Sequence, residues 1–232
     1  MNGRIYLIPV TLGGDDFLAV IPERVISLTR QLRFFIVEDL RSARRFLRLI
    51  DKEFPIDEAV FFELNEHTDD SDIAHFLDPA LKGSDIGVLS EAGLPGIADP
   101  GAEIVRIAHK KKISVTPLSG PSSILLALIS SGLNGQNFTF NGYLPVKPDE
   151  RSSKLRELEK KAHDGFTQIF METPYRNQRM LDSIINTCHN ETMLCIAIDI
   201  TLPTESIRTM KVSEWKKDQP SIDDKLVVFV MQ

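Results

Sequence analysis

The chain has 232 residues, of which 42% are hydrophobic and 26% charged, and it carries a net charge of −6 with a pI near 5.4. This composition excludes intrinsic disorder and is typical of one large or two compact globular domains. No apolar run reaches the roughly 18 residues of a membrane helix, and the N-terminus lacks the apolar core of a secretory signal. We therefore expect a cytoplasmic protein without a membrane partner, and the acidic balance argues mildly against nucleic acid.

The two cysteines give no sign of a metal or redox site. Cys188 and Cys195 match no zinc or redox spacing. We expect two buried reduced thiols and no metal site.

Short β-rich runs alternate with amphipathic helical patterns in the first half of the chain. Strands are predicted at 4–9, 34–38, 61–64, 86–90 and 113–117, and helices at 20–31, 41–51, 71–77, 102–111 and 122–131. This alternation is typical of βαβ units around a mostly parallel sheet.

The pattern changes after residue 134. Strands are predicted at 138–143 and 166–171, helices at 153–162 and 178–188, and then strands at 193–200, 206–212 and 225–231, with a turn at 213–217. Closely spaced strands favour antiparallel pairing. The sequence thus predicts an α/β fold of two lobes, a mostly parallel lobe at 1–117 and a mixed lobe at 118–232.

The most informative loop is Ser90-Glu-Ala-Gly-Leu-Pro-Gly-Ile-Ala-Asp-Pro-Gly101, between a predicted strand and a helix. Ligands of α/β sheets bind at such strand ends, and its glycines permit close backbone approach. The alternative is an elaborate turn without a ligand. Loops 9–14 and 117–123 also contain glycine and follow predicted strands. Loop 117–123 leads into a predicted helix, whose N-terminus either binds an anion or is simply the capped start of a buried helix.

Two common nucleotide motifs are absent from the sequence. It contains neither GxGxxG nor GxxxxGK[ST], which disfavours an ordinary Rossmann nucleotide site or an ATPase.

Six ordered segments resemble the motifs of one known family. They are Glu38-Asp-Leu-Arg41 (E-D-T-R), Ser90–Gly101 (S-D-A-G-T-P…D-P-G), Pro117–Ser123 (P-L-P-G-P-S-A), Phe140–Lys147 (F-x-G-F-L-P-x-K), Phe170–Arg176 (F-Y-E-S-P-H-R) and Ala197–Thr201 (A-R-E-L-T). By these motifs the chain resembles the tetrapyrrole-methylase superfamily and, within it, the ribosomal small-subunit RNA (cytidine-2′-O)-methyltransferases.

The resemblance implies two α/β lobes, usually as a homodimer, with S-adenosylmethionine (SAM) in the cleft between them and ribosomal RNA as the methyl acceptor. It also implies the residues that bind the cofactor, largely through backbone groups. These are Ser90, Glu91, Ala92, Gly93, Leu94, Pro95, Ser122, Ser123, Met171, Glu172 and Ala197.

Several polar motif positions differ from the family pattern. Glu91 replaces an aspartate, Leu94 a threonine, Tyr175 a histidine, and Ile198 and Leu202 replace basic residues. Two alternatives therefore stay open: a methyltransferase for a small, tetrapyrrole-like acceptor, and a degenerate paralogue that binds SAM without transferring methyl groups.

A ribose hydroxyl is a poor nucleophile and gains from a hydrogen-bonding base. The candidates are Glu38, Asp39 and Glu91 at predicted strand ends, and His67 in a loop. Each acid is alternatively a helix cap or an ion-pair partner, and the histidine alternatively a surface residue. We predict Glu38, Glu91 and Arg41 as the catalytic residues.

Arg41 also begins a stripe of arginines on one predicted helix. Arg41, Arg44, Arg45 and Arg48 share one face, and Ala43, Phe46, Leu47 and Ile50 share the opposite one. The stripe either grips RNA phosphates or is a solvated face paired with acids elsewhere.

Overall fold

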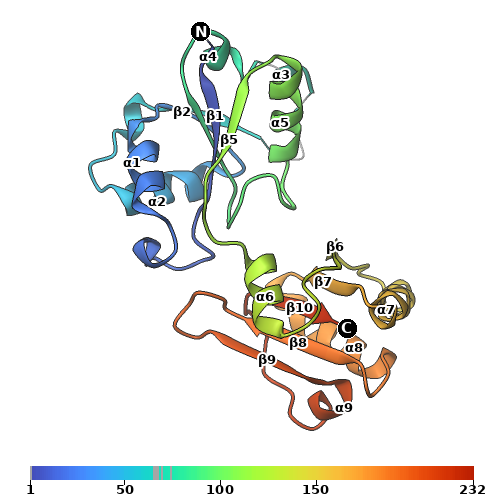
Figure 1. Cartoon of the computed structure of the whole chain (residues 1–232). Helices are drawn as coiled ribbons and strands as arrows, with labels where there is room; N and C mark the ends of the chain where they lie inside the picture. Colours follow the sequence, from blue (N-terminus) through green and yellow to red (C-terminus); the bar gives the residue numbers. More distant parts are fainter. Residues whose placement is uncertain (1, 65–67, 69, 74) are drawn as a thin grey trace. The chain divides into compact units, whose positions relative to one another are not determined.

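The computed structural model describes residues 2–64, 68, 70–73 and 75–232 (Figure 1). Contacts between Cα atoms divide the chain into two compact units, residues 1–122 and 123–232. The sequence placed this boundary after residue 117. Each unit has its own five-stranded sheet.

The first unit is built on a parallel sheet in the order β3-β2-β4-β1-β5. Its strands are β1 (Arg4–Ile8), β2 (Phe34–Val37), β3 (Val60–Glu63), β4 (Ile86–Leu89) and β5 (Ser114–Pro117). All residues of the central strand β4 are buried, as its unbroken apolar sequence requires. The predicted parallel sheet is confirmed, and its order brings the loops after β1, β2 and β4 to one edge.

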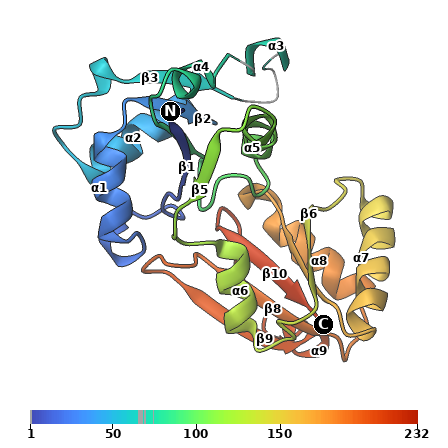
Figure 2. The same cartoon turned by 45° about the horizontal axis from the view of Figure 1, so that its top comes forward.

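Helices cover both faces of this sheet. They are α1 (Glu23–Gln31), α2 (Leu40–Ile50), α3 (Asp70–Ile73), α4 (Asp78–Leu81) and α5 (Gly101–Lys110), with short 3-10 turns η1 (Phe17–Ala19) and η2 (Ile56–Glu58). Helices α1 and α2 lie on one face and α5 on the other (Figures 1 and 2). Successive side chains of β2 point to opposite faces of the sheet, so this strand contributes to the hydrophobic core on each face. Phe35 and Val37 pack toward α1 and α2, whereas Ile36 packs in the cluster that contains Ile104 of α5.

Two of the predicted helices in this unit were wrong in detail. Helix α1 begins at Glu23 rather than at residue 20, because Pro22 holds an extended backbone directly before it. The helix predicted at 71–77 is replaced by the two short helices α3 and α4. Pro79 lies in the first turn of α4, where its missing N–H leaves no hydrogen bond unmade.

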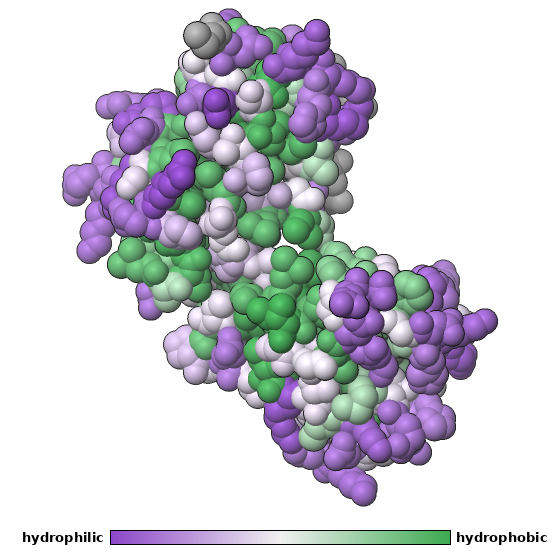
Figure 3. Space-filling model, in the orientation of Figure 1, coloured by the Kyte–Doolittle hydropathy of each residue, from purple (hydrophilic) through white to green (hydrophobic). Residues whose placement is uncertain are grey.

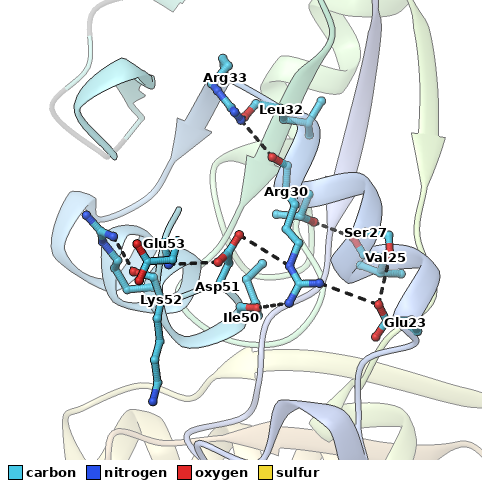
Figure 4. Close-up of polar contacts among 12 residues, drawn as sticks. Glu23, Val25, Ser27, Arg30, Leu32, Arg33, Ile50, Asp51, Lys52 and Glu53 are labelled. Carbon is cyan, nitrogen blue, oxygen red and sulfur yellow. Dashed lines mark hydrogen bonds and ion pairs between the residues drawn. The ribbon is translucent and has the colours of Figure 1, made fainter. Parts of the chain in front are cut away.

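Arg30 fastens helix α1 to the end of α2 (Figure 4). Its Nη2 donates to the carbonyl of Ile50 at 2.6 Å, and its Nε lies 3.8 Å from Asp51 Oδ2. A charged donor on a helix C-terminal carbonyl is favourable. This contact supports the C-terminal end of α2, the helix that begins just after β2.

The second unit is built on a mixed sheet in the order β6-β7-β10-β8-β9. Its strands are β6 (Phe138–Tyr143), β7 (Thr167–Met171), β8 (Met193–Ile198), β9 (Ser206–Lys211) and β10 (Val227–Met231). Strands β6 and β7 are parallel, and the other neighbours are antiparallel. The predicted mixed sheet is confirmed. However, β9 and β10 are not neighbours, because β10 lies between β7 and β8.

Helices also cover both faces of this second sheet. They are α6 (Ser123–Ser131), α7 (Pro148–His163), α8 (Asn177–Thr187) and α9 (Val212–Trp215), with the 3-10 turn η3 (Pro174–Arg176). Helices α7, α8 and α9 pack around Phe170 and Phe229 on one face, and α6 contacts β8, β9 and β10. Helix α7 begins earlier than predicted because Pro148 is accepted in its first turn. A short helix, α9, replaces the turn predicted at 213–217.

Cys188 and Cys195 are buried free thiols in this second unit. In the described part of the chain, no group of His, Cys, Asp and Glu side chains is placed to hold a metal ion. Across the same residues, no helix has the length and apolar character needed to cross a bilayer.

Candidate functional site

Three loops meet at the carboxyl edge of the first sheet. Val10, which follows β1, donates its N–H to the carbonyl of Gly93 at 2.9 Å. Glu38, which follows β2, accepts the N–H of Glu91 on its Oε2 at 3.0 Å. The structure therefore brings together the predicted residues Glu38, Glu91 and Gly93, as expected for the ends of parallel strands.

The loop at 117–123 joins the same group. A Cβ placed on Gly120 would lie 2.2 Å from the Cβ of Pro9, so only glycine allows the two loops to approach this closely. Ser122 is buried at the end of the first unit, and Ser123 begins α6. The second and third loops singled out from the sequence are thus in direct contact.

Within the loop from Ser90 to Gly101, Asp99 accepts hydrogen bonds from the backbone. The Asp99 carboxylate accepts the N–H of Gly96 at 2.8 Å and that of Gly101 at 2.6 Å. Gly93 has a φ of +72°, which side chains rarely adopt. Ser90 Oγ donates to the carbonyl of Ala92 at 3.2 Å. Sequence reasoning missed Asp99, although an aspartate directly before Pro-Gly is a recognisable turn signal.

The carboxylates at this edge differ in their electrostatic environment. Burial raises the pKa of Glu38, the N–H of Glu91 opposes that change, and the charges of Asp99, Glu91 and Asp39 add to it. Burial also raises the pKa of Asp99 despite its backbone donors. A cavity of about 10 Å³, enough for one water molecule, is lined by both Glu38 and Asp99. Glu38 is accordingly suited to accept a proton at this edge.

Asp39 is a helix cap, which the sequence left open as the alternative to a catalytic role. Its Oδ1 accepts the N–H of Ser42 at 2.7 Å, which makes Asp39 the N-cap of α2. The N–H and side chain of Ser42 lower the pKa of Asp39. Asp39 therefore caps a helix, while Glu38 beside it faces the glycine loop. The remaining candidate, His67, lies outside the described residues.

The arginine stripe on α2 is exposed, and the opposite face is buried, as predicted. Hydrophilic side chains project around α1 and α2 in Figure 3. Arg44 lies over the ring of Phe61 at 5.5 Å, and Arg48 donates to the carbonyl of Lys52 at 2.6 Å. Within the described part of the chain, no carboxylate forms an ion pair with Arg41, Arg44, Arg45 or Arg48. Arg41 and Arg45 are both exposed, and the charge of Arg41 contributes to lowering the pKa of Asp39.

In the second unit, the loop after β7 contains a buried ion pair. The side chain of Glu172 is 1% exposed, and its Oε1 accepts Arg176 Nη2 at 2.5 Å and the N–H of Thr173 at 2.7 Å. Arg176 Nε also donates to Thr173 Oγ1 at 2.9 Å. The carboxylate of Glu172 is therefore already paired within the loop.

A second buried acid follows β8. Asp199 accepts hydrogen bonds from Lys225 Nζ at 2.8 Å, Thr204 Oγ1 at 2.7 Å and the N–H of Leu226 at 3.1 Å. Burial alone would raise the pKa of Asp199, but these donors outweigh it and lower the pKa. The predicted ligand Ala197 lies within β8 and is fully buried. Sequence reasoning missed Asp199, because two of its partners, Lys225 and Leu226, are distant in the chain.

Comparisons with known proteins agree with this architecture. Residues 4–216 match the family model of the Tetrapyrrole (Corrin/Porphyrin) Methylases. The crystal structure of the methyltransferase CobJ has a TM-score of 0.64 at 17% identity and covers 98% of this chain and 93% of its own. The uroporphyrin-III-C-methyltransferase from Thermus thermophilus has a TM-score of 0.57 at 15% identity, with 100% and 92% covered. At these identities the two structures show a shared fold.

Curated relatives are closer in sequence. Ribosomal RNA small subunit methyltransferase I of Vibrio cholerae is 30% identical over 90% of this chain and 69% of its own length. The protein of the same name from Haemophilus influenzae is 31% identical over 95% and 75%, and that from Escherichia coli O157:H7 is 29% identical over 94% and 73%. The chain therefore belongs to the tetrapyrrole methylase family of methyltransferases, whose methyl donor is SAM.

Proposed function

We propose that this protein methylates a ribose 2′-hydroxyl of small-subunit ribosomal RNA, with SAM as the methyl donor. The observation that carries the proposal is the name shared by the relatives from Vibrio cholerae and Haemophilus influenzae, which align over 90% and 95% of this chain. We propose that the enzyme acts in the cytoplasm, which is also the expectation from the sequence.

The residues at the carboxyl edge of the first sheet fit this donor. A sulfonium cofactor with an amino acid end and a nucleoside end needs many backbone donors and acceptors and few side chains. Ser90–Pro95 supplies such a backbone surface, since Gly93 holds a positive φ and Asp99 closes the loop behind it. SAM supplies an activated methyl group, so the protein mainly has to position the acceptor and exclude water. Ser122, Ser123, Met171, Glu172 and Ala197 stay predicted ligands from the resemblance.

Glu38 is the proposed general base. Its carboxylate is oriented by the Glu91 N–H, and its raised pKa brings it closer to neutral pH, where a base accepts protons most effectively. As the ribose oxygen is methylated, Glu38 takes up its proton. Glu91 contributes to this step through its backbone N–H, so we rank Glu38 ahead of Glu91.

The arginine stripe of α2 is the proposed contact to RNA phosphates. The chain as a whole is acidic, so phosphate binding requires a local basic surface. Arg41 and Arg45 are exposed and form no ion pair with any described carboxylate. Arg41 also lies three residues after Glu38, which puts a phosphate contact near the proposed base.

Calorimetric titration with SAM tests the donor site. Gly93→Trp is compared with Gly132→Trp, because both glycines have φ near +72° but only Gly93 has close neighbours, Leu12 Cδ2 at 3.2 Å and Pro121 O at 3.4 Å from a built Cβ. Both variants carry the same backbone strain. We expect binding to be lost only in Gly93→Trp, and equal affinity in the two variants would contradict a donor site at this loop.

Mass spectrometry of small-subunit RNA tests the acceptor. RNA from cells that lack the gene should miss one ribose methyl group, and the purified protein should restore it. SAM binding without transfer to RNA would favour the small-molecule acceptor, and folded protein without SAM binding would favour the degenerate paralogue. The homodimer implied by the resemblance stays a prediction, which sedimentation velocity of the purified protein tests.

A further inference from the structure

An exposed aromatic side chain stands on the loop that follows β7. Tyr175 is 68% exposed and lies in the middle of η3, four residues after Met171, the last residue of the strand. A single exposed aromatic residue is ordinary on a protein surface. Tyr175 differs from such a residue in how firmly its surroundings are held.

The support beneath Tyr175 is the ion pair described above. Arg176 is held by Glu172 at 2.5 Å and by Thr173 Oγ1 at 2.9 Å. Its guanidinium carbon lies 5.6 Å from the centroid of the Tyr175 ring, within the range of a cation–π contact. One face of the ring is therefore covered by a fixed cation, and the ring is positioned before any ligand arrives.

The charge of Arg176 is already balanced by Glu172, whose side chain is 1% exposed. Arg176 is thus a poor phosphate ligand, and what this loop offers to a partner is the uncovered face of Tyr175. A flat, preorganised ring with one free face matches an unstacked nucleobase, because every base has a π face and single-stranded RNA is bound by stacking on aromatic side chains.

We propose that Tyr175 is a substrate-binding residue on which one nucleobase of the RNA stacks. The inference rests on the proposed function and adds to it the residue that receives a base. Tyr175 does not bind the methyl donor. The loop backbone at Met171 and Glu172 and the ring at Tyr175 therefore have separate roles, which different measurements can distinguish.

The experiment uses the full chain and small ribosomal subunits from cells that lack the gene. Tyr175→Ala removes the ring, and Tyr175→Phe keeps the ring without the hydroxyl. Phe166→Ala is the matched control, because Phe166 is an exposed aromatic residue just before the start of β7, at the opposite end of that strand from Tyr175. For each protein, kcat and KM for subunits and the Kd for SAM are measured.

In Tyr175→Ala we expect KM for subunits to rise at least about fivefold, the lower limit for loss of one stacked base. Its Kd for SAM should be unchanged, and Tyr175→Phe and Phe166→Ala should behave as wild type. An unchanged KM in Tyr175→Ala would overturn the inference, as would a rise in its Kd for SAM that matches the rise in KM. If the wild-type protein transfers no methyl group to subunits, the proposed function fails first and this inference fails with it.

Discussion

Replacement of Arg176 by methionine tests whether the ion pair after β7 is structural. Arg176→Met keeps much of the aliphatic volume of the side chain but removes the charge that faces Glu172. The Glu172 side chain is 1% exposed and that of Arg176 is 19% exposed, so the remaining carboxylate would stay buried without its cation.

The expected loss follows from these contacts. Removal of one partner of a buried ion pair destabilises a protein by about 3–5 kcal/mol. Arg176 is partly exposed, and Glu172 would still accept the Thr173 N–H at 2.7 Å. We therefore expect Arg176→Met to lower the free energy of unfolding by about 2–4 kcal/mol. The matched control is Lys211→Met, which breaks a pair to Glu191 whose side chains are 47% and 63% exposed, and this variant should lose far less stability because water screens an exposed pair.

Urea unfolding followed by tryptophan fluorescence measures both variants. Trp215 is the chain's single tryptophan and is buried in the second unit, the unit that contains both ion pairs. Its emission therefore reports unfolding of the relevant unit, even if the two units unfold separately.

A double variant separates the buried charge from general damage to the loop. Glu172→Gln combined with Arg176→Met leaves a neutral amide in place of the stranded carboxylate, so it should be more stable than Arg176→Met alone. Equal losses of stability in Arg176→Met and Lys211→Met would refute the reasoning.

Three further predictions concern other groups. Glu38→Gln should lower kcat on the order of 10²–10⁴-fold. In a pH–rate profile, wild-type activity should fall as the pH falls through the raised pKa of Glu38, and the variant should lack this decrease. Because a raised folded-state pKa means that ionised Glu38 weakens folding at neutral pH, the melting temperature of Glu38→Gln should not fall. Arg41→Gln and Arg45→Gln should each reduce the slope of log KM for ribosomal subunits against log salt by about 1, whereas Lys110→Gln on α5 should not; equal slopes in all three would exclude the stripe from RNA binding. Burial raises the pKa of Cys188 to about 12, so its thiol should react with a thiol-specific reagent only as urea exposes it, and rapid labelling of folded protein would contradict this.

Local patterns in the sequence determined most of the secondary structure. The apolar run of β4 could be recognised because a strand buried on both faces is apolar along its whole length. The two faces of α2 could be recognised because one-sided burial imposes a period of 3.6 residues on a helix. The alternation of such segments sufficed for a parallel first sheet and a mixed second one. The glycine loop at 90–101 was located by the same local reasoning, and its resemblance to family motifs identified the methyltransferase.

Tertiary structure decided what these patterns leave open. The position of β10 between β7 and β8 depends on pairing between distant segments, which no local period encodes. The roles of the acids depend on which donors the fold brings to them: Asp39 caps a helix, Glu38 receives the Glu91 N–H, and Glu172 is buried against Arg176. An acidic side chain has the same chemistry at each of these positions. Its function differs because only the folded chain assembles its burial and its hydrogen-bond partners, which raise the pKa of Glu38 and lower the pKa of Asp39.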